Sequence, residues 1–337
     1  MTKTLIDAQS QPVFGFHTTP VGRVNYQDYD LRTMMDRKRS RLARTMAFNQ
    51  FQFIGLTGPD WIGGIAIVDL KWLSVGFFYL YDIPRNERLE HSFQRPLAAG
   101  TTIEPDPDNG KAQCRSRATS IQITPEGDTR RIQLRDSKRG IDADLCLHGT
   151  GMANPLRLCS PAGYQRWSFT QKWAGLSVEG QWRWGDRRYE CSDQQGASID
   201  WSCGHMRRET AWNWASLSGF TDSGERVGLN LATGINESGV SENALWVEGQ
   251  QELLAQAQFT FDRYDRDSAW QIRTRDARVE LYFEPLGCRA ERINAGVIAS
   301  NFRQFYGYFT GTLQTQSGEL LKLSRTPGFV EDHYARW

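Results

Sequence analysis

Almost every segment of this sequence alternates large apolar side chains with small or polar ones and then reaches a turn signal. An alternation with period two is the pattern of strands whose two faces differ, and Gly, Pro, Asn and Asp mark the turns. Helical periodicity is nearly absent, and one short helix is expected over residues 30–41, with a basic loop as the alternative. Strands are expected over 44–56, 61–70, 71–81, 113–124, 130–136, 141–148, 167–173, 176–184, 210–218, 226–233, 244–248, 252–262, 270–274, 278–284, 304–314 and 320–325. The pattern predicts an all-β protein with few short helices.

The strand pattern stops once and then starts again. Residues 149–163 are rich in Gly and Pro and show little alternation. We therefore predict two tandem antiparallel β-barrels or sandwiches, formed by residues 1–150 and 164–337. One large undivided β-sandwich is the alternative.

Charge and composition exclude several classes of partner. The 337 residues include 40 Lys+Arg and 39 Asp+Glu, so a net charge of +1 provides no overall field to attract nucleic acid. The basic residues 37–41 form the densest local group of charges, and we interpret them as a solvent-exposed segment that leads into a strand. No segment approaches the roughly 18 consecutive apolar residues of a membrane-spanning helix.

The cysteine pattern favours a cytoplasmic protein with reduced thiols. The N-terminus lacks the apolar segment of a secretory signal, and the six cysteines are too sparse for a disulfide scaffold. Cys203-Gly204-His205, taken with Cys191, has no CxxC or HExxH partner, so we predict neither a metal site nor a cofactor.

The candidate binding site lies on the hairpin of residues 210–233. Trp212 and Trp214 share one face of its first strand, and Asn213 lies on the other. A four-residue turn over 222–225 would pair Ala215 with Ala232. This register places Leu229 and Leu231 with the tryptophans and Asn230 with Asn213. Neither face has the charged side chains of a solvent-exposed surface, so we expect other parts of the protein to pack against both. Either face could then point into the barrel, and we expect the face with the tryptophans to do so.

Two acids near these strands are candidates for catalysis. Glu242 shares a face with Ala244 and Trp246, and apolar neighbours would raise the pKa of its carboxyl toward neutrality. Capping of a turn is the alternative role for Glu242. Asp69 ends an apolar strand and is either a buried acid or a strand-end residue.

The C-terminal segment carries a second group of charges. Glu331, His333 and Arg336 fall within a few residues of one another, close to the terminal indole of Trp337. We expect these three side chains to form a salt-bridged latch that closes a barrel.

Five segments together resemble a known bacterial family. They are IAIVDLKWLSVGFFYLYD, ETAWNWASLSGF, RVGLNLATG, SENALWVEG and GFVEDHYARW, and the family is catalogued as domain of unknown function 2804. The resemblance runs from about Pro20 to Trp337. More distantly, the predicted tandem barrel is similar to the lipocalin-like group of carotenoid hydratases and tocopherol cyclases, which act on long apolar molecules. This second resemblance implies a fold, and it concerns function only by analogy.

Three functions are compatible with these features. The first is binding of a lipid- or isoprenoid-like molecule in a cavity lined by Trp212, Trp214 and Trp246, with Asn213 and Asn230 orienting its polar end. The second is acid-catalysed hydration, cyclisation or isomerisation of an unsaturated substrate, with Glu242 or Asp69 as the acid. The third is a structural protein whose indoles only fill its cores.

Overall fold

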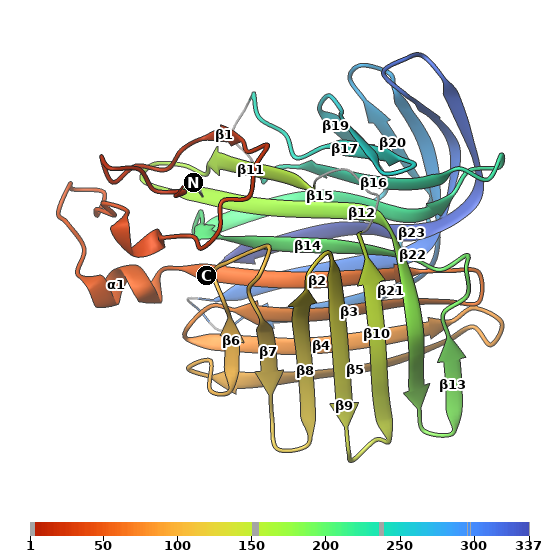
Figure 1. Cartoon of the computed structure of the whole chain (residues 1–337), viewed down its shortest axis with the longest axis horizontal. Helices are drawn as coiled ribbons and strands as arrows, with labels where there is room; N and C mark the ends of the chain where they lie inside the picture. The colour runs from red at the N-terminus through yellow and green to blue at the C-terminus, as the bar shows by residue number, and fades with distance from the viewer. Residues whose placement is uncertain (1–3, 150–154, 236–238, 295, 297, 337) are drawn as a thin grey trace.

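The computed structural model describes residues 4–149, 155–235, 239–294, 296 and 298–336, and within them it shows two large antiparallel sheets (Figure 1). The first sheet contains β1 (Gly15–Phe16), β2 (Asn49–Thr57), β3 (Trp61–Asp69), β4 (Leu73–Asp82), β5 (Glu87–Pro96), β6 (Thr101–Ile103), β7 (Ala112–Arg115), β8 (Thr119–Glu126), β9 (Thr129–Asp136), β10 (Ile141–His148), β11 (Leu156–Pro161), β12 (Trp167–Trp184), β13 (Arg187–Glu190) and β14 (Gly196–His205). The second contains β15 (Glu209–Phe220), β16 (Arg226–Thr233), β17 (Ala244–Val247), β18 (Gln250–Leu253), β19 (Ala257–Thr260), β20 (Trp270–Thr274), β21 (Val279–Asn294), β22 (Ala299–Gln314) and β23 (Leu320–Arg336). The all-β fold class is confirmed.

The expected helix over residues 30–41 is wrong in its position. The short helix α1 spans Arg41–Met46, and one 3-10 turn, η1, covers Tyr26–Asp28. Helix α1 begins where Ser40 caps it, because the Ser40 hydroxyl accepts a hydrogen bond from the Ala43 amide at 3.2 Å. The residues before it form a tight turn in which Asp36 takes a left-handed conformation, φ 60°, and this turn interrupts any helix.

The first sheet curls into a near-barrel around the larger core. Its strand order is β5-β4-β3-β2-β14-β12-β10-β9-β8-β7-β6, and the inner faces of these strands bury one continuous apolar cluster. The two ends of the sheet meet where the hydroxyls of Ser74 on β4 and Thr101 on β6 lie 2.6 Å apart.

The second sheet is a half-barrel with its own core. Its order is β18-β17-β16-β15-β23-β22-β21-β20-β19. Leu217, Leu229, Leu231 and Val330 are among the residues that fill its concave side. The chain passes from the first sheet to the second between His205 on β14 and Glu209 on β15. Strands β11 to β14 therefore belong to the first sheet although they follow residue 150. Division into two independently folding units at residues 149–163 stays a prediction, and residues 150–154 of this segment lie outside the described residues.

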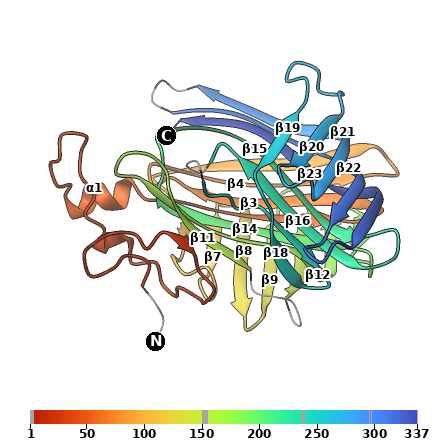
Figure 2. The same cartoon turned by 90° about the horizontal axis from the view of Figure 1, so that it is seen from above.

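The outer faces of the two sheets pack against each other. Both views place strands β21–β23 beside β2–β4 (Figures 1 and 2). A third apolar cluster joins them and includes Phe53 and Tyr79 from the first sheet with Trp214 and Phe329 from the second. At Gly228 the backbones approach so closely that a Cβ there would lie 2.3 Å from the carbonyl carbon of Ala174. The two sheets are thus one packed body.

The register predicted for the β15–β16 hairpin is wrong by one residue. Ala215 pairs with Leu231, and Trp214 pairs with Ala232. The amide of Thr221 donates to the Glu225 carbonyl, so the connection is a three-residue loop with Gly224 at φ 98° in place of the expected four-residue turn. A one-residue shift exchanges the faces of a whole strand.

The shift moves Asn230 onto the tryptophan face and the two leucines onto the opposite face. The tryptophans therefore do not point into the second barrel. Ala215 and Leu229 face its core, whereas Trp212 and Trp214 face the first sheet. The face that we expected to lie inside a barrel instead forms part of the contact between the two sheets.

None of the helices in the described part of the chain has the length and apolar character needed to cross a membrane.

Candidate functional site

A cavity lies between the two sheets. It has a volume of about 230 Å³, and strands β2, β3, β4, β12 and β14 of the first sheet face β15, β21, β22 and β23 of the second across it. Its walls are mainly apolar and include Phe51, Phe53, Val68, Leu70, Leu73, Val75, Phe77, Trp212, Trp214, Ile235, Ile293, Ile298 and Phe302. A concave apolar site with a few polar groups is the usual form of a small-molecule site.

A buried ion pair lies in the wall formed by the first sheet. Lys172 on β12 is directly opposite Asp200 on β14, and the Lys172 ammonium lies 2.5 Å from the Asp200 carboxylate. The Lys172 side chain is 2% exposed. Burial lowers the pKa of Lys172, but Asp200 and Glu242 more than offset this effect, so the pKa lies above the ordinary lysine value and the ammonium stays charged. The site therefore holds a permanent cation in apolar surroundings.

Glu242 contacts this ion pair from the second sheet. It precedes β17, and its carboxylate oxygen Oε1 lies 3.6 Å from the Lys172 ammonium. The same oxygen makes no hydrogen bond to any residue that the structure describes. Burial raises the pKa of Glu242 to about 7, and Lys172 opposes the rise. Glu242 thus exchanges a proton near neutral pH while Lys172 stays charged.

Asn230 fixes the position of Glu242. Its amide nitrogen donates to the Glu242 carbonyl at 2.8 Å, and its oxygen accepts from the Trp214 indole at 2.9 Å. Asn243 holds the same segment, because its side chain accepts from the Ala232 amide and donates to the Ala255 carbonyl. These bonds attach the segment that carries the acid to β16 and to the connection between β18 and β19.

A second acid lines the cavity on β23. Glu331 accepts from the Trp212 indole at 2.8 Å and from the Gln304 amide at 3.1 Å, and Gln304 in turn accepts from the Tyr79 hydroxyl at 2.6 Å. The His333 ring packs on Trp212 with centroids 4.1 Å apart and lies 3.4 Å from the Glu331 carboxylate. Glu331 is therefore held as a hydrogen-bond acceptor by two groups of the second sheet, and Gln304 links it to Tyr79 of the first.

An arginine lies at another point of the lining. Arg289 on β21 is 3% exposed and lies over the Phe77 ring, 3.9 Å from its centroid. It also donates to the Glu291 carboxylate at 3.0 Å. The charge of Arg289 is thus balanced by Glu291, and its guanidinium group stacks on the ring of Phe77.

The family comparison agrees with the sequence pattern. The family described as domain of unknown function (DUF2804) matches residues 2–337. The chain belongs to this family. No match was found among curated proteins.

Solved structures share the fold of the DUF2804 chain at low identity. CghA aligns with a TM-score of 0.53 and 11% identity over 98% of this chain and 96% of CghA. A Nitrosomonas europaea protein provisionally named AttH aligns with a TM-score of 0.50 and 13% identity, over 85% of this chain and 91% of that protein. Kievitone hydratase from Nectria haematococca aligns with a TM-score of 0.45 and 10% identity, over 85% of this chain and 88% of the hydratase. The likenesses to CghA and to the Nitrosomonas europaea protein concern the fold alone.

Four of the predicted site residues come together in the DUF2804 chain. Glu242, Trp212 and Trp214 line the cavity. Asn230 lies outside the lining and forms hydrogen bonds with both Trp214 and Glu242. The sequence associates these residues only through proximity on one hairpin and the segment after it. The structure adds the contact with the first sheet.

Three predicted site residues lie elsewhere. Asp69 is outside the cavity lining and pairs with Lys71, whose amide and ammonium both bond to its carboxylate. Asn213 faces the other side of β15 and bonds to Asp332. Trp246 packs with Leu156 and Ala174 in a separate small cluster. Asp69 is both buried and the last residue of β3, so the structure does not separate the two roles considered for it.

The predicted latch forms in part. His333 contacts Glu331, whereas Arg336 donates to the Gly296 carbonyl. Trp337 lies outside the described residues. The strand that carries these groups, β23, lies inside the second sheet between β15 and β22.

Lys172 and Asp200 are the site residues that sequence reasoning missed. Each stands in a strand beside a tryptophan, in QKW and IDW. A charged residue in such a strand is the available signal, because a charge is seldom buried without a partner. Their pairing depends on the long-range register of β12 with β14.

Proposed function

We propose that the cavity between the sheets binds a lipid- or isoprenoid-like small molecule with one polar group near Lys172 and Glu242. The observation that carries the proposal is the combination of apolar walls with the buried set Lys172, Asp200 and Glu242. A purely structural contact has no need of these charges, because apolar residues of similar volume are often as stable or more so. An empty apolar cavity also lowers the stability of the folded protein, because its walls lack packing contacts, and a bound ligand would supply those contacts.

Extraction of the purified protein tests this proposal. Denaturation followed by mass spectrometry is expected to release an apolar molecule, and adding that molecule back is expected to raise the Tm. Val68→Trp places an indole in the cavity wall and is expected to abolish both results. Val13→Trp is the matched control, because Val13 is exposed and away from the lining.

Two results would contradict this proposal. One is retention of the molecule by Val68→Trp at the level of the control, which would place the binding site elsewhere. The other is the absence of any recovered molecule together with no Tm shift across a panel of fatty acids, sterols and isoprenoids.

Proton transfer to a bound alkene is the second candidate function. The observation that favours it is the pKa of about 7 for Glu242 in an apolar cavity. The Glu242 proton would form a new C–H bond as the π bond of the substrate opens, leaving a carbocation and the Glu242 carboxylate. The indole faces of Trp212 and Trp214 would stabilise the cation. Addition of water and loss of its proton to Glu242 would give an alcohol, and loss of a neighbouring proton instead would give an isomer.

Amide substitution tests proton transfer separately from binding. Glu242→Gln is expected to retain the apolar molecule but to lose turnover of it by at least about a hundredfold. Glu284→Gln is the control, because Glu284 is exposed, paired with Arg325 and absent from the cavity lining. Loss of turnover in Asp69→Asn with full activity in Glu242→Gln would assign the acid role to Asp69.

A further inference from the structure

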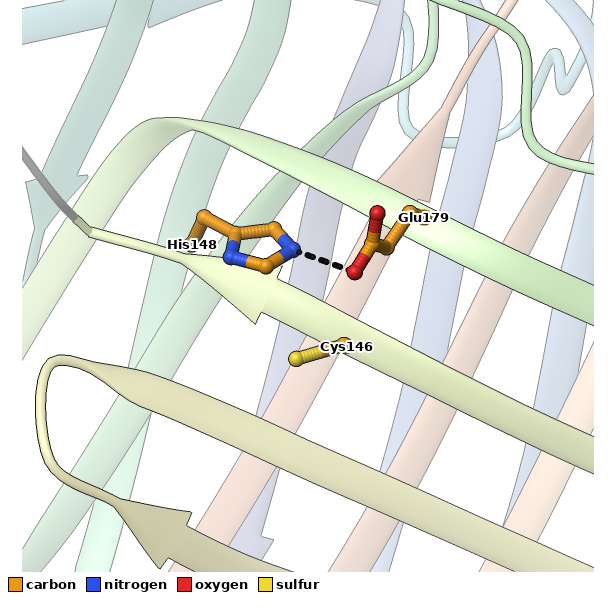
Figure 3. A group of neighbouring side chains, drawn as sticks. All are labelled: Cys146, His148 and Glu179. Carbon is orange, nitrogen blue, oxygen red and sulfur yellow. Dashed lines mark ion pairs between the residues drawn. The ribbon is translucent and has the colours of Figure 1, made fainter.

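Three metal-binding side chains gather on the outer face of the first sheet, away from the cavity lining (Figure 3). They are Cys146 and His148 on β10 and Glu179 on β12. The nearest donor atoms, one from each residue, all lie within 4.8 Å of one another. The His148 Nε2 atom lies 3.1 Å from the Glu179 carboxylate, which is the contact dashed in the figure.

Strand geometry alone brings these three groups together. Along β10 the alternate residues Leu145 and Leu147 are buried in the core, so Cys146 and His148 both project from the opposite face. Glu179 pairs directly with Cys146 in the register of β10 with β12. The donors thus stand on adjacent paired strands, where the backbone is held by the sheet.

The imidazole of His148 and the thiol of Cys146 are available as ligands. Nε2 of His148 makes no hydrogen bond to any described residue and lies beside the carboxylate of Glu179, another member of the group. Cys146 is one of the cysteines that form no disulfide.

We propose that Cys146, His148 and Glu179 bind one Zn²⁺ ion on the surface of the first sheet. Thiolate, imidazole and carboxylate are the three protein ligands of Zn²⁺, whereas Mg²⁺ and Ca²⁺ require oxygen donors. Binding would form the Zn–S bond as the Cys146 proton passes to solvent. The three side chains leave the fourth tetrahedral position for water, as in open zinc sites. This site is independent of the proposed cavity function.

Cobalt titration tests the site without any need for an enzyme assay. The full chain, free of any polyhistidine tag and treated with chelator, is titrated with Co²⁺ while the absorption is recorded. We expect one Co²⁺ per chain, with a thiolate-to-cobalt charge-transfer band and the visible bands of a tetrahedral ion. Zn²⁺ is expected to displace the cobalt and to abolish these bands.

Substitutions assign the ligands. Cys146→Ser is expected to remove the charge-transfer band, and His148→Ala and Glu179→Gln to weaken Co²⁺ binding by more than about tenfold. Cys288→Ser is the control, because Cys288 is a half-buried thiol of the second sheet and its loss is expected to leave the spectrum unchanged.

Three outcomes would overturn the proposal. They are the absence of a charge-transfer band in the native chain, a band that survives in Cys146→Ser but disappears in Cys191→Ser, and wild-type affinity in Glu179→Gln. Glu179 has a side chain that is 72% exposed, so its substitution keeps the test valid even where another variant fails to fold.

Discussion

Replacement of Lys172 by Met is expected to lower the free energy of unfolding by about 3–5 kcal/mol. Met retains most of the side-chain volume but removes the ammonium that lies 2.5 Å from the carboxylate of Asp200. The variant leaves two carboxyl groups, those of Asp200 and Glu242, in a buried site with no cation beside them. Denaturant unfolding at pH 7 measures the loss, provided that the slope of the transition is unchanged.

The double variant Lys172→Met/Asp200→Leu separates charge from packing. Because the uncompensated carboxylate is also removed, we expect most of the lost stability to return, and the difference from additivity gives the coupling energy. A double variant as unstable as the single one would show that the shape of the lysine chain, and not its charge, supports the contact between the sheets.

The alternation of side chains was sufficient to predict the β architecture because it is a local property. Residues 61–70 and 141–148, for example, coincide with β3 and β10 to within a residue at each end. Alternation does not record where a strand bends. Residues 167–173 and 176–184 are therefore one strand, β12, with an irregularity between Trp173 and Leu176. Similarly, residues 113–124 divide into β7 and β8 at a turn.

The partners of the tryptophans on β16 depend on one residue in a loop. Gly224 permits a left-handed conformation that shortens the turn, and the pairing of the whole hairpin shifts with it. This shift brings Asn230 to the same face as Trp214. No local pattern distinguishes turns that differ by one residue, and the side to which the tryptophans point depends on how the two sheets pack.

The charges of the site were harder still to predict. Glu242 can be identified from the sequence because Ala244 and Trp246 follow it at alternate positions. Lys172 contacts Glu242 only because the two sheets pack face to face, and no local pattern encodes that contact. The raised pKa of Glu242 follows from its burial between the sheets, which involves residues 70 positions apart in the chain.

The pH dependence of stability is expected to change when Glu242 is replaced by Gln. The pKa of this carboxyl rises from 4.5 to about 7 on folding. Between these values the folded chain holds a proton that the unfolded chain has released, so stability falls as pH rises. The contribution is fully present below about pH 4.5 and is lost above about pH 7, and it amounts to about 3 kcal/mol.

Glu242→Gln keeps a neutral side chain of the same shape at every pH and therefore loses this dependence. Relative to wild type, we expect the variant to gain about 3 kcal/mol between pH 4.5 and pH 8, measured by denaturant unfolding at both values. The stability of Glu284→Gln is expected to equal that of wild type at both pH values, because the Glu284 side chain is exposed. Parallel profiles for wild type and Glu242→Gln would mean that Glu242 ionises as readily inside the folded chain as outside it. Lys172 would then stabilise the Glu242 carboxylate fully, and the cavity would contain no acid able to donate a proton near neutral pH.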